Sequence, residues 1–383
     1  MVWACRSIRP DRMRGKKMRN KWYVLSGGYT EPIQMGSGEI VPGRGEGIGL
    51  FTMDGETGEM ARLAMMPCNP NPSYLTLSKD GNYLYSVNEL KEYHGIPGSL
   101  VSAYRLNKEA GTMEFLGSQF TCGMDACYVQ LWQDEKWLLT ANYSGGSIAV
   151  FPVLDDGSLG HASCVLRHAG HGTHPDRQAG PHPHQILPAP DGCHVYVPDL
   201  GLDKLVCYRM DTENGWLVKD HWQDIAGIPG QGVRHGVFDS TGTRLYVMTE
   251  MAAQVNVYRY DPQSGEALLM QTCDTVEHEG WLLGAAVRLH ASGKWLYVSV
   301  RGANQLVVFR VEEDGILTKL QTISSGGQIP RDFILTPDGR FLLAANQDSD
   351  NVCVFAVDAD TGMLTQSFAQ DHIGAVTVLQ ITE

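Results

Sequence analysis

Seven short acidic turns, each closing on a glycine, recur along the chain at intervals of 46 to 58 residues. DGETG, DPQSG and DADTG are examples, and apolar, strand-like segments flank each turn. The closing glycines are Gly58, Gly111, Gly157, Gly215, Gly265, Gly315 and Gly362. A repeat of this length built from strands is typical of a propeller, whose blades surround a central axis. The pattern predicts an all-β, seven-bladed β-propeller of four-stranded antiparallel blades.

The sixth repeat shows the strands expected of one blade. They are predicted at 284–290 (GAAVRLH), 294–301 (KWLYVSVR), 305–311 (QLVVFRV) and 316–324 (ILTKLQTIS). The middle two are rich in β-branched and aromatic residues and alternate with a period of two. Segments of the same kind occur in the other repeats, and no segment has a convincing helical period.

The two ends of the repeat array predict how the ring closes. The first repeat has no inner strand before Lys21, whereas the apolar segment 375–381 (AVTVLQI) is left over after the last repeat. Placing this C-terminal strand in the first blade completes the ring and removes exposed strand edges. Residues 21–383 are therefore expected to form a single domain.

Residues 1–20 differ from the rest of the chain in charge. They hold seven basic residues against one acidic residue, Asp11, and no apolar core follows them. This composition does not fit a secretory signal. We expect a disordered basic tail or a translation start assigned too early, with Met18 as the alternative start; a functional basic arm is the other interpretation.

The overall composition and net charge restrict which kinds of binding partner are expected. The net charge of −13 argues against non-specific nucleic-acid binding, and no apolar run is long enough to span a bilayer. A small anionic ligand remains compatible, because charges beyond about 10 Å are largely screened and a few local arginines can dominate a pocket. Nine scattered cysteines without a CxxC pair favour reduced thiols and a cytoplasmic location. We expect a monomer or a weak homo-oligomer.

A long polar insert, residues 167–185 (RHAGHGTHPDRQAGPHPHQ), carries five histidines between the third and fourth repeats. His182 and His184 open the predicted inner strand 182–190, and residues i and i+2 of a strand point to the same face. Clustered histidines can bind zinc, but the chain has no HExxH motif and no helix to hold paired ligands. The insert is interpreted as a metal-free active-site edge, with a solvated loop and a metal site as alternatives.

Charged side chains also stand at the ends of predicted strands that face the axis. Those at the starts of inner strands or the ends of second strands are Glu89, Arg234, His235, Glu250, Arg301, Arg331 and Asp332. In a radial arrangement these strand ends meet at one rim. For each residue the alternative is a surface ion pair or a turn. The chain has no GxSxG elbow and no phosphate-binding GxxxxGK[ST] loop.

Five longer phrases carry a family resemblance: HPDRQAGPHPHQ (174–185), VRHGVF (233–238), YVMTEMAAQVNVY (246–258), YVSVRGANQLVVF (297–309) and PRDFILTPDGRFLLAANQ (330–347). With these phrases in order, one per blade, residues 21–381 resemble the lactonase family of seven-bladed propellers. That family includes propeller-type 6-phosphogluconolactonases and fungal carboxy-muconate lactonizing enzymes. WD-repeat and kelch signatures are missing.

The resemblance implies a set of side chains at the mouth of the channel. The implied catalytic residues are His184, Glu250, Arg234 and Arg301, and the expected substrate-binding residues are His182, Arg331, His235 and Gln185. The choice between Arg301 and Arg331, and between the two histidines, stays open. No metal and no cofactor are expected.

The function expected from this resemblance is hydrolysis of a sugar-acid lactone, namely 6-phospho-D-glucono-1,5-lactone to 6-phosphogluconate, in the pentose phosphate pathway of carbohydrate metabolism. Glu250 or neutral His184 would take the proton of water, and arginines would stabilise the oxyanion. Glu250→Gln or His184→Ala is expected to reduce turnover strongly without unfolding the protein. The alternatives are a carboxy-cis,cis-muconate-type lactonizing cycloisomerase and a non-catalytic propeller that binds a protein or a sugar acid.

Overall fold

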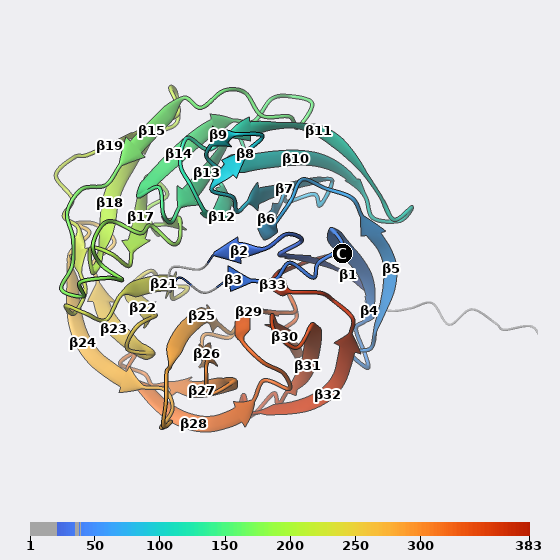
Figure 1. The fold of residues 1–383 in the computed structure, drawn as a ribbon. Coiled ribbons are helices and arrows are strands. Elements are labelled where there is room, and N and C mark those ends of the chain that lie inside the picture. Colours follow the sequence, from blue (N-terminus) through green and yellow to red (C-terminus); the bar gives the residue numbers. More distant parts are fainter. Residues whose placement is uncertain (1–20, 35–37, 39) are drawn as a thin grey trace, which may run out of the picture.

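The computed structural model describes residues 21–34, 38 and 40–383. In this part of the chain the regular elements are all strands, and seven antiparallel sheets stand around a central axis as blades (Figure 1). The predicted seven-bladed propeller is confirmed. The basic tail expected at residues 1–20 lies outside the described residues.

Five blades place their four strands in chain order from the axis outward. The second blade contains β6 (Pro72–Leu77), β7 (Tyr83–Asn88), β10 (Leu100–Asn107) and β11 (Thr112–Phe120), and the third contains β12 (Ala126–Leu131), β13 (Trp137–Asn142), β14 (Ser147–Pro152) and β15 (Cys164–Arg167). The fifth contains β21 (Val233–Phe238), β22 (Arg244–Thr249), β23 (Gln254–Tyr260) and β24 (Ala267–Asp274). The sixth contains β25 (Leu283–Leu289), β26 (Trp295–Arg301), β27 (Gln305–Val311) and β28 (Leu317–Ser324), and the seventh contains β29 (Pro330–Leu335), β30 (Phe341–Asn346), β31 (Asn351–Val357) and β32 (Leu364–Asp371).

The first blade closes the ring with both ends of the domain. Its strands, from the axis outward, are β33 (Val376–Thr382), β1 (Lys21–Gly28), β4 (Ile48–Asp54) and β5 (Met60–Met66). β33 and β1 pair antiparallel from Tyr23 opposite Thr382 to Gly28 opposite Val376. The predicted closure by the C-terminal strand is thus confirmed, and it gives the first blade a hydrogen-bonded inner strand like those of its neighbours.

The fourth blade departs from the expected pattern. It contains β16 (Leu187–Pro188), β17 (His194–Asp199), β18 (Lys204–Asp211), β19 (Trp216–Val218) and β20 (Ile225–Ala226), and β19 and β20 both pair with β18. The predicted length of the inner strand, 182–190, is wrong. Only Pro183, in an isolated bridge to Asp199, and the two residues of β16 pair with β17. Prolines without an N–H interrupt the ladder here.

Two small hairpins lie outside the blades. β2 (Ile33–Gln34) pairs with β3 (Ile40–Val41), and β8 (Glu92–Tyr93) pairs with β9 (Ile96–Pro97). In Figure 1 the β2–β3 hairpin lies across the middle of the ring and the β8–β9 hairpin overlies the blade of β10 and β11. Both hairpins therefore belong to connections between blade strands rather than to the blades themselves.

The repeated glycines join neighbouring blades. Gly362 closes its turn with φ of 71°, and a Cβ there would lie 2.3 Å from the Trp295 ring of the preceding blade. The hydroxyl of Tyr297 also donates to the Gly362 carbonyl at 2.9 Å, and Tyr246 makes the same bond to Gly315 at 3.0 Å. The glycine is repeated because both the backbone turn and the blade contact require it.

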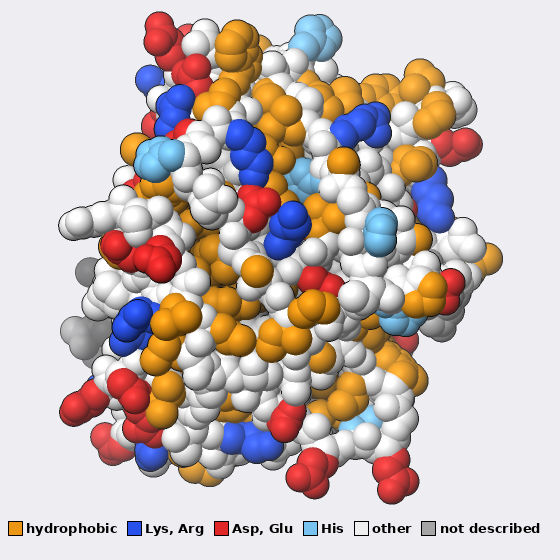
Figure 2. Space-filling model, turned by 90° about the vertical axis from the view of Figure 1, so that its left-hand side faces the viewer, with side chains coloured by type: hydrophobic (Ala, Val, Ile, Leu, Met, Phe, Trp, Pro, Cys, Tyr) orange, Lys and Arg blue, Asp and Glu red, His pale blue; other side chains and the backbone are white. Residues whose placement is uncertain are grey.

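The outer surface mixes both signs of charge. In Figure 2, acidic and basic side chains lie alone or in small groups among hydrophobic and uncharged ones on the face shown, and neither sign forms a continuous field there. Within the described part of the chain, no helix has the length and apolar character needed to cross a membrane. Buried charges of both signs, including Arg234, Glu250 and Arg301, lie together near the propeller axis.

Candidate active site

The inner strands begin with β-bulges, and these bulges aim side chains at the axis. In the second, third, fifth and seventh blades, one residue near the start of the inner strand has no partner in the register. These unpaired residues are Ser73, Cys127, Arg234 and Arg331. A bulge bends the strand and redirects the extra side chain, and all four of these residues line one enclosed space.

His184 reaches the same space by an equivalent irregularity. Pro183 pairs with Asp199 and Leu187 with Tyr196, so residues 183–187 on one side lie opposite the one-residue-shorter segment 196–199 on the other. The backbone N–H of His184 donates to the carbonyl of Pro198 at 2.9 Å, which holds this proline-rich segment beside β17. The segment thus replaces a regular inner strand but still delivers one side chain to the channel.

A cavity of about 430 Å³ opens at the mouth of the channel. Ends of second strands supply several of its walls: Glu89, Tyr143, Glu250, Arg301 and Gln347. A small space of about 10 Å³ lies against it and shares Glu89, Cys127, His184 and Arg331 with it. The larger volume falls within the usual range for small-molecule sites.

Three arginines surround the carboxylate of Glu250. Arg301 Nη2 lies 2.8 Å and Arg234 Nε lies 3.0 Å from Oε2, and Arg177 Nη2 donates to Oε1. Burial acts to raise the pKa of Glu250, but Arg301, Arg177 and Arg234 outweigh it and hold that pKa well below its usual range. Glu250 is therefore a fixed carboxylate and a weak base.

The arginines around Glu250 remain charged at neutral pH. Burial, followed by repulsion from Arg301, lowers the pKa of Arg234 to about 10. Burial also lowers the pKa of Arg301, although the carboxylate of Glu250 opposes the shift. Arg234 Nη1 in addition donates to the carbonyl of Ala285 at 2.7 Å. These contacts orient the guanidinium groups in advance, as stabilisation of an oxyanion requires.

His184 is buried and neutral. Burial and the charge of Arg234 hold the pKa of His184 well below its usual range, while Glu250 acts in the opposite sense. Its Nδ1 lies 3.8 Å from the Sγ of Cys127. A neutral imidazole in this position can accept a proton, and the carboxylate of Glu250 would stabilise the resulting cation.

A second ion pair borders the small space through Asp332. Arg288 Nη2 donates to Asp332 Oδ1 at 2.9 Å. The rings of His235 and Tyr128 meet at 5.6 Å, and burial together with Arg234 lowers the pKa of His235. His235 and Asp332, like Arg234, line the small space and not the larger cavity.

Two predicted substrate-binding residues lie outside both cavity walls. The amide of Gln185 bonds the backbone of Gly236, accepting at 2.6 Å and donating at 3.2 Å. His182 stacks on Tyr143 with ring centroids 4.4 Å apart, and its Nδ1 lies 3.0 Å from the Tyr143 carbonyl. Both side chains contact backbone that shapes the site, and their role in binding stays a prediction.

Arg177 is the site residue that sequence reasoning missed. It belongs to the histidine-rich insert and lines the large cavity. The loop is fixed by Gln178, whose side chain accepts the N–H groups of Thr173 and His174 and donates to Asp203 at 2.6 Å. The sequence feature that could have identified Arg177 is its place within HPDRQAG, part of one of the phrases that carry the resemblance.

The other histidines of the insert are dispersed. His168 Nδ1 lies 2.6 Å from Asp199 Oδ2 in a buried pair, and His174 Nδ1 accepts the N–H of Arg177 at 3.1 Å. Within residues 21–34, 38 and 40–383, no three histidine, cysteine or acidic side chains are grouped to hold a metal ion. The eight cysteines of this part are all free thiols.

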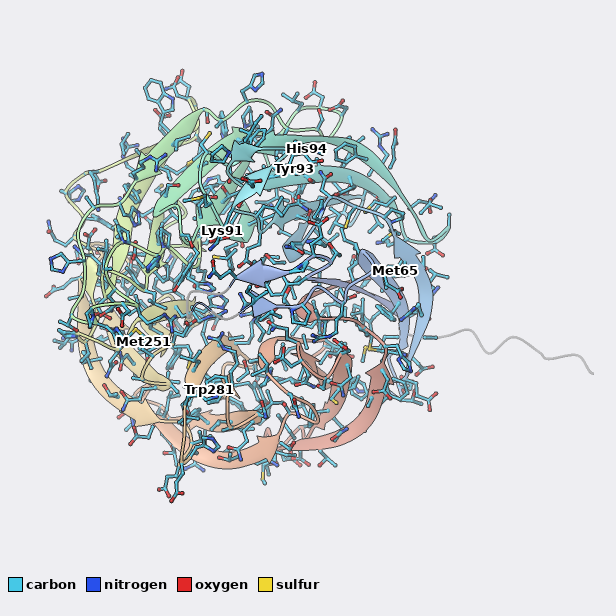
Figure 3. The ribbon with its side chains drawn as sticks, viewed as in Figure 1. Met65, Lys91, Tyr93, His94, Met251 and Trp281 are labelled. Atoms are coloured by element: carbon cyan, nitrogen blue, oxygen red, sulfur yellow. The ribbon has the colours of Figure 1, made fainter. Side chains whose placement is uncertain are left out.

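The rim of the cavity comes from connections of different blades. Figure 3 shows Lys91 with Tyr93 and His94 in the sector of β6–β11, and Trp281 in the sector of β25–β28. Trp281 is 57% exposed and lines the cavity. Asp348 also lines it and lies 3.9 Å from Arg44. The rim is therefore mixed, whereas the arginines concentrate around Glu250.

Comparisons with known proteins agree with this architecture. The 6-phosphogluconolactonase of Bacillus subtilis is 33% identical over 331 residues, which cover 86% of this chain and 92% of that protein. The 6-phosphogluconolactonase of Formosa agariphila is 27% identical, covering 84% of this chain and 91% of that protein. The solved structure of a periplasmic gluconolactonase from Pseudomonas aeruginosa matches with a TM-score of 0.87 and 33% identity, covering 95% of this chain and 99% of its own.

The family model described as "Lactonase, 7-bladed beta-propeller" matches residues 23–381, which is nearly the whole propeller. The match includes both the strand that opens the first blade and the C-terminal strand that completes it. Family, blade number and ring closure therefore agree, and this chain belongs to the family of seven-bladed β-propeller lactonases.

Proposed function

We propose that this protein hydrolyses a phosphorylated sugar-acid lactone, 6-phospho-D-glucono-1,5-lactone, to 6-phosphogluconate without a metal ion. The observation that carries the proposal is the convergence of four arginines on the channel mouth: Arg177, Arg234, Arg301 and Arg331. Arginine binds phosphate and carboxylate groups through paired hydrogen bonds. Arg177, Arg301 and Arg331 line the cavity of about 430 Å³, and Arg234 lines the small space beside it. Such a concentration of cations suits a small anionic substrate.

Different residues carry out different steps of lactone hydrolysis. Neutral His184 takes a proton from water as the water oxygen bonds to the lactone carbonyl carbon. Arg234 and Arg301, already held by Glu250, stabilise the negative charge that develops on the carbonyl oxygen. Of the two bases considered from the sequence, His184 is favoured over Glu250, because arginines already bind both oxygens of that carboxylate and compete with water for them.

A paired-substrate assay tests this proposal. The protein is supplied with 6-phosphoglucono-1,5-lactone and with unphosphorylated glucono-1,5-lactone, each with and without EDTA, and the products are identified. We expect ring opening with uptake of water, a kcat/KM at least about tenfold higher for the phosphorylated lactone, and no loss with EDTA. Each substrate is also followed without protein, because lactones hydrolyse spontaneously.

Three results would each contradict a part of the proposal. No acceleration of either lactone overturns hydrolysis, and equal kcat/KM for the two lactones overturns phosphate recognition. Loss of activity in EDTA that zinc restores overturns metal independence. In a separate assay with carboxy-cis,cis-muconate, formation of an isomeric lactone would instead support a lactonizing cycloisomerase.

A further inference from the structure

Glu89 is a second buried carboxylate in the site, and the mechanism above does not use it. It is the first residue after β7, as Glu250 is the first after β22. Its exposed fraction is 6%, and it lines both the large cavity and the small space beside it. Its position gives it access to the same bound molecule as His184, which also lines both.

The partners of Glu89 differ from those of Glu250. The hydroxyl of Tyr29 donates to Glu89 Oε2 at 3.1 Å, while Arg331 Nη2 lies 4.0 Å from Oε1, beyond hydrogen-bond distance. Glu250 has instead close arginine contacts on both of its oxygens. The carboxyl group of Glu89 is therefore held in place while Oε1 keeps capacity for a proton.

Burial shifts Glu89 toward its protonated form. It raises the pKa of Glu89; the positive charge of Arg331 opposes this shift, the carboxylate of Asp125 adds to it, and the hydroxyl groups of Ser73 and Tyr29 oppose it. The thiol of Cys127 also faces Glu89, and its own pKa is raised by burial to a value that keeps it neutral. Two carboxyl groups with opposite shifts in one site are the usual arrangement for an acid and a charge stabiliser.

We infer that Glu89 is the general acid that protonates the ring oxygen of the lactone as the ring opens. This inference rests on the proposed hydrolysis. The bond from carbonyl carbon to ring oxygen breaks, its electron pair stays on that oxygen, and the proton of Glu89 forms the new hydroxyl group. The proton that His184 took from water then restores Glu89, since both side chains line the small space, and the product acid releases its own proton to solvent.

The test compares two leaving groups in the variant Glu89→Gln. The substrates are the oxygen lactone and the corresponding 1,5-thiolactone, whose sulfur leaves as a stable thiolate and needs little help from an acid. We expect kcat to fall about 100- to 10,000-fold on the oxygen lactone, with KM nearly unchanged, and to fall less than about tenfold on the thiolactone. Glu92→Gln, an exposed residue of the nearby β8, is the matched control and should keep wild-type values on both.

The outcomes separate this inference from the proposed function. Wild-type protein that accelerates neither substrate overturns both. Active wild-type protein with an unimpaired Glu89→Gln overturns the role of Glu89 alone, and so does an equal loss on both substrates, which would indicate a structural effect.

A milder variant, Tyr29→Phe, covers the case in which Glu89→Gln does not fold. It removes the hydroxyl that favours ionised Glu89 but keeps the ring beneath Arg331. Because an acid works only while protonated, activity should decline at high pH through the pKa of Glu89, and Tyr29→Phe should move that decline to higher pH. A decline at the same pH as in the wild type, after subtraction of uncatalysed hydrolysis, would contradict the inference.

Discussion

Glu89 and Glu250 occupy equivalent places in two blades, yet their surroundings give them different chemistry. Three arginines from the histidine-rich insert, β21 and β26 hold Glu250 as a carboxylate. Glu89 faces one more distant arginine and a tyrosine hydroxyl. Repetition of a strand ending in glutamate therefore does not repeat its function, because the neighbouring blades decide which charges meet it.

The strongest test of this difference is Glu250→Gln. Removing one charge from a buried cluster leaves the three arginines uncompensated, and breaking such a pair costs about 3–5 kcal/mol. We expect the free energy of unfolding to fall by that amount and kcat/KM to fall by at least about 100-fold, since Arg234 and Arg301 lose their common anchor. Chemical denaturation and steady-state kinetics measure both, and unchanged stability would contradict the assignment of Glu250 as the centre of the cluster.

His184→Ala tests the residue between the two carboxylates. The imidazole is expected to act as the base, so kcat should fall about 100- to 10,000-fold. Loss of a neutral buried ring should disturb the arginines little, and KM should stay within a few-fold of the wild type. The same steady-state assay measures both constants. A large rise in KM with unchanged kcat would show that His184 binds substrate instead.

Arg177→Gln tests the arginine that the histidine-rich insert contributes to the cluster around Glu250. Its side chain is 18% exposed, against 3% for Arg234 and 6% for Arg301. We expect KM for the phosphorylated lactone to rise about tenfold, with a smaller change for the unphosphorylated lactone. An equal rise for both substrates would place the phosphate elsewhere, and Arg331→Gln is then the next variant to compare.

The smallest expected effect concerns stability as a function of pH. Glu250 has a lowered pKa in the folded protein, so its stabilisation is present above the unfolded-state pKa of about 4.3 and is lost as the pH falls through the folded value. Glu89 has a raised pKa in the folded protein. Its ionised form therefore lowers the free energy of unfolding above that pKa, and this loss of stability disappears at lower pH. Glu89→Gln should therefore change stability by no more than about 1 kcal/mol at pH 8 and favour folding, whereas Glu250→Gln should be most harmful there. Unfolding curves at pH 5 and pH 8 compare them, and parallel behaviour would remove the distinction.

Much of the site could be predicted, since the resemblance carried His184, Arg234, Glu250 and Arg301 to one place. The structure brings these four together: His184, Glu250 and Arg301 line the large cavity, and Arg234 lines the small space beside it and contacts Glu250. Their catalytic roles stay predictions. Gln185 was expected to bind substrate, but it lines neither cavity, and its amide is hydrogen-bonded to the backbone of Gly236. The segment between Pro183 and β16 is irregular, so proximity in sequence was a poor guide there.

The sequence by itself determined the architecture. Acidic turns ending in glycine at intervals of 46 to 58 residues, apolar second strands and an unused C-terminal strand allow one economical arrangement, a closed ring of seven blades. These features are local, because turn geometry and strand periodicity depend on residues close together in the chain.

The tertiary structure alone decided which side chains reach the axis and in what state of charge. One unpaired residue in an inner strand turns Arg234 or Arg331 into the channel, and a bulge is defined only by the partner strand it pairs with. Likewise, the environment of Glu89 depends on Tyr29 and Arg331, which lie 60 residues before it and 242 residues after it in the chain. A pKa reflects burial and charges in space, and these exist only once the ring has closed.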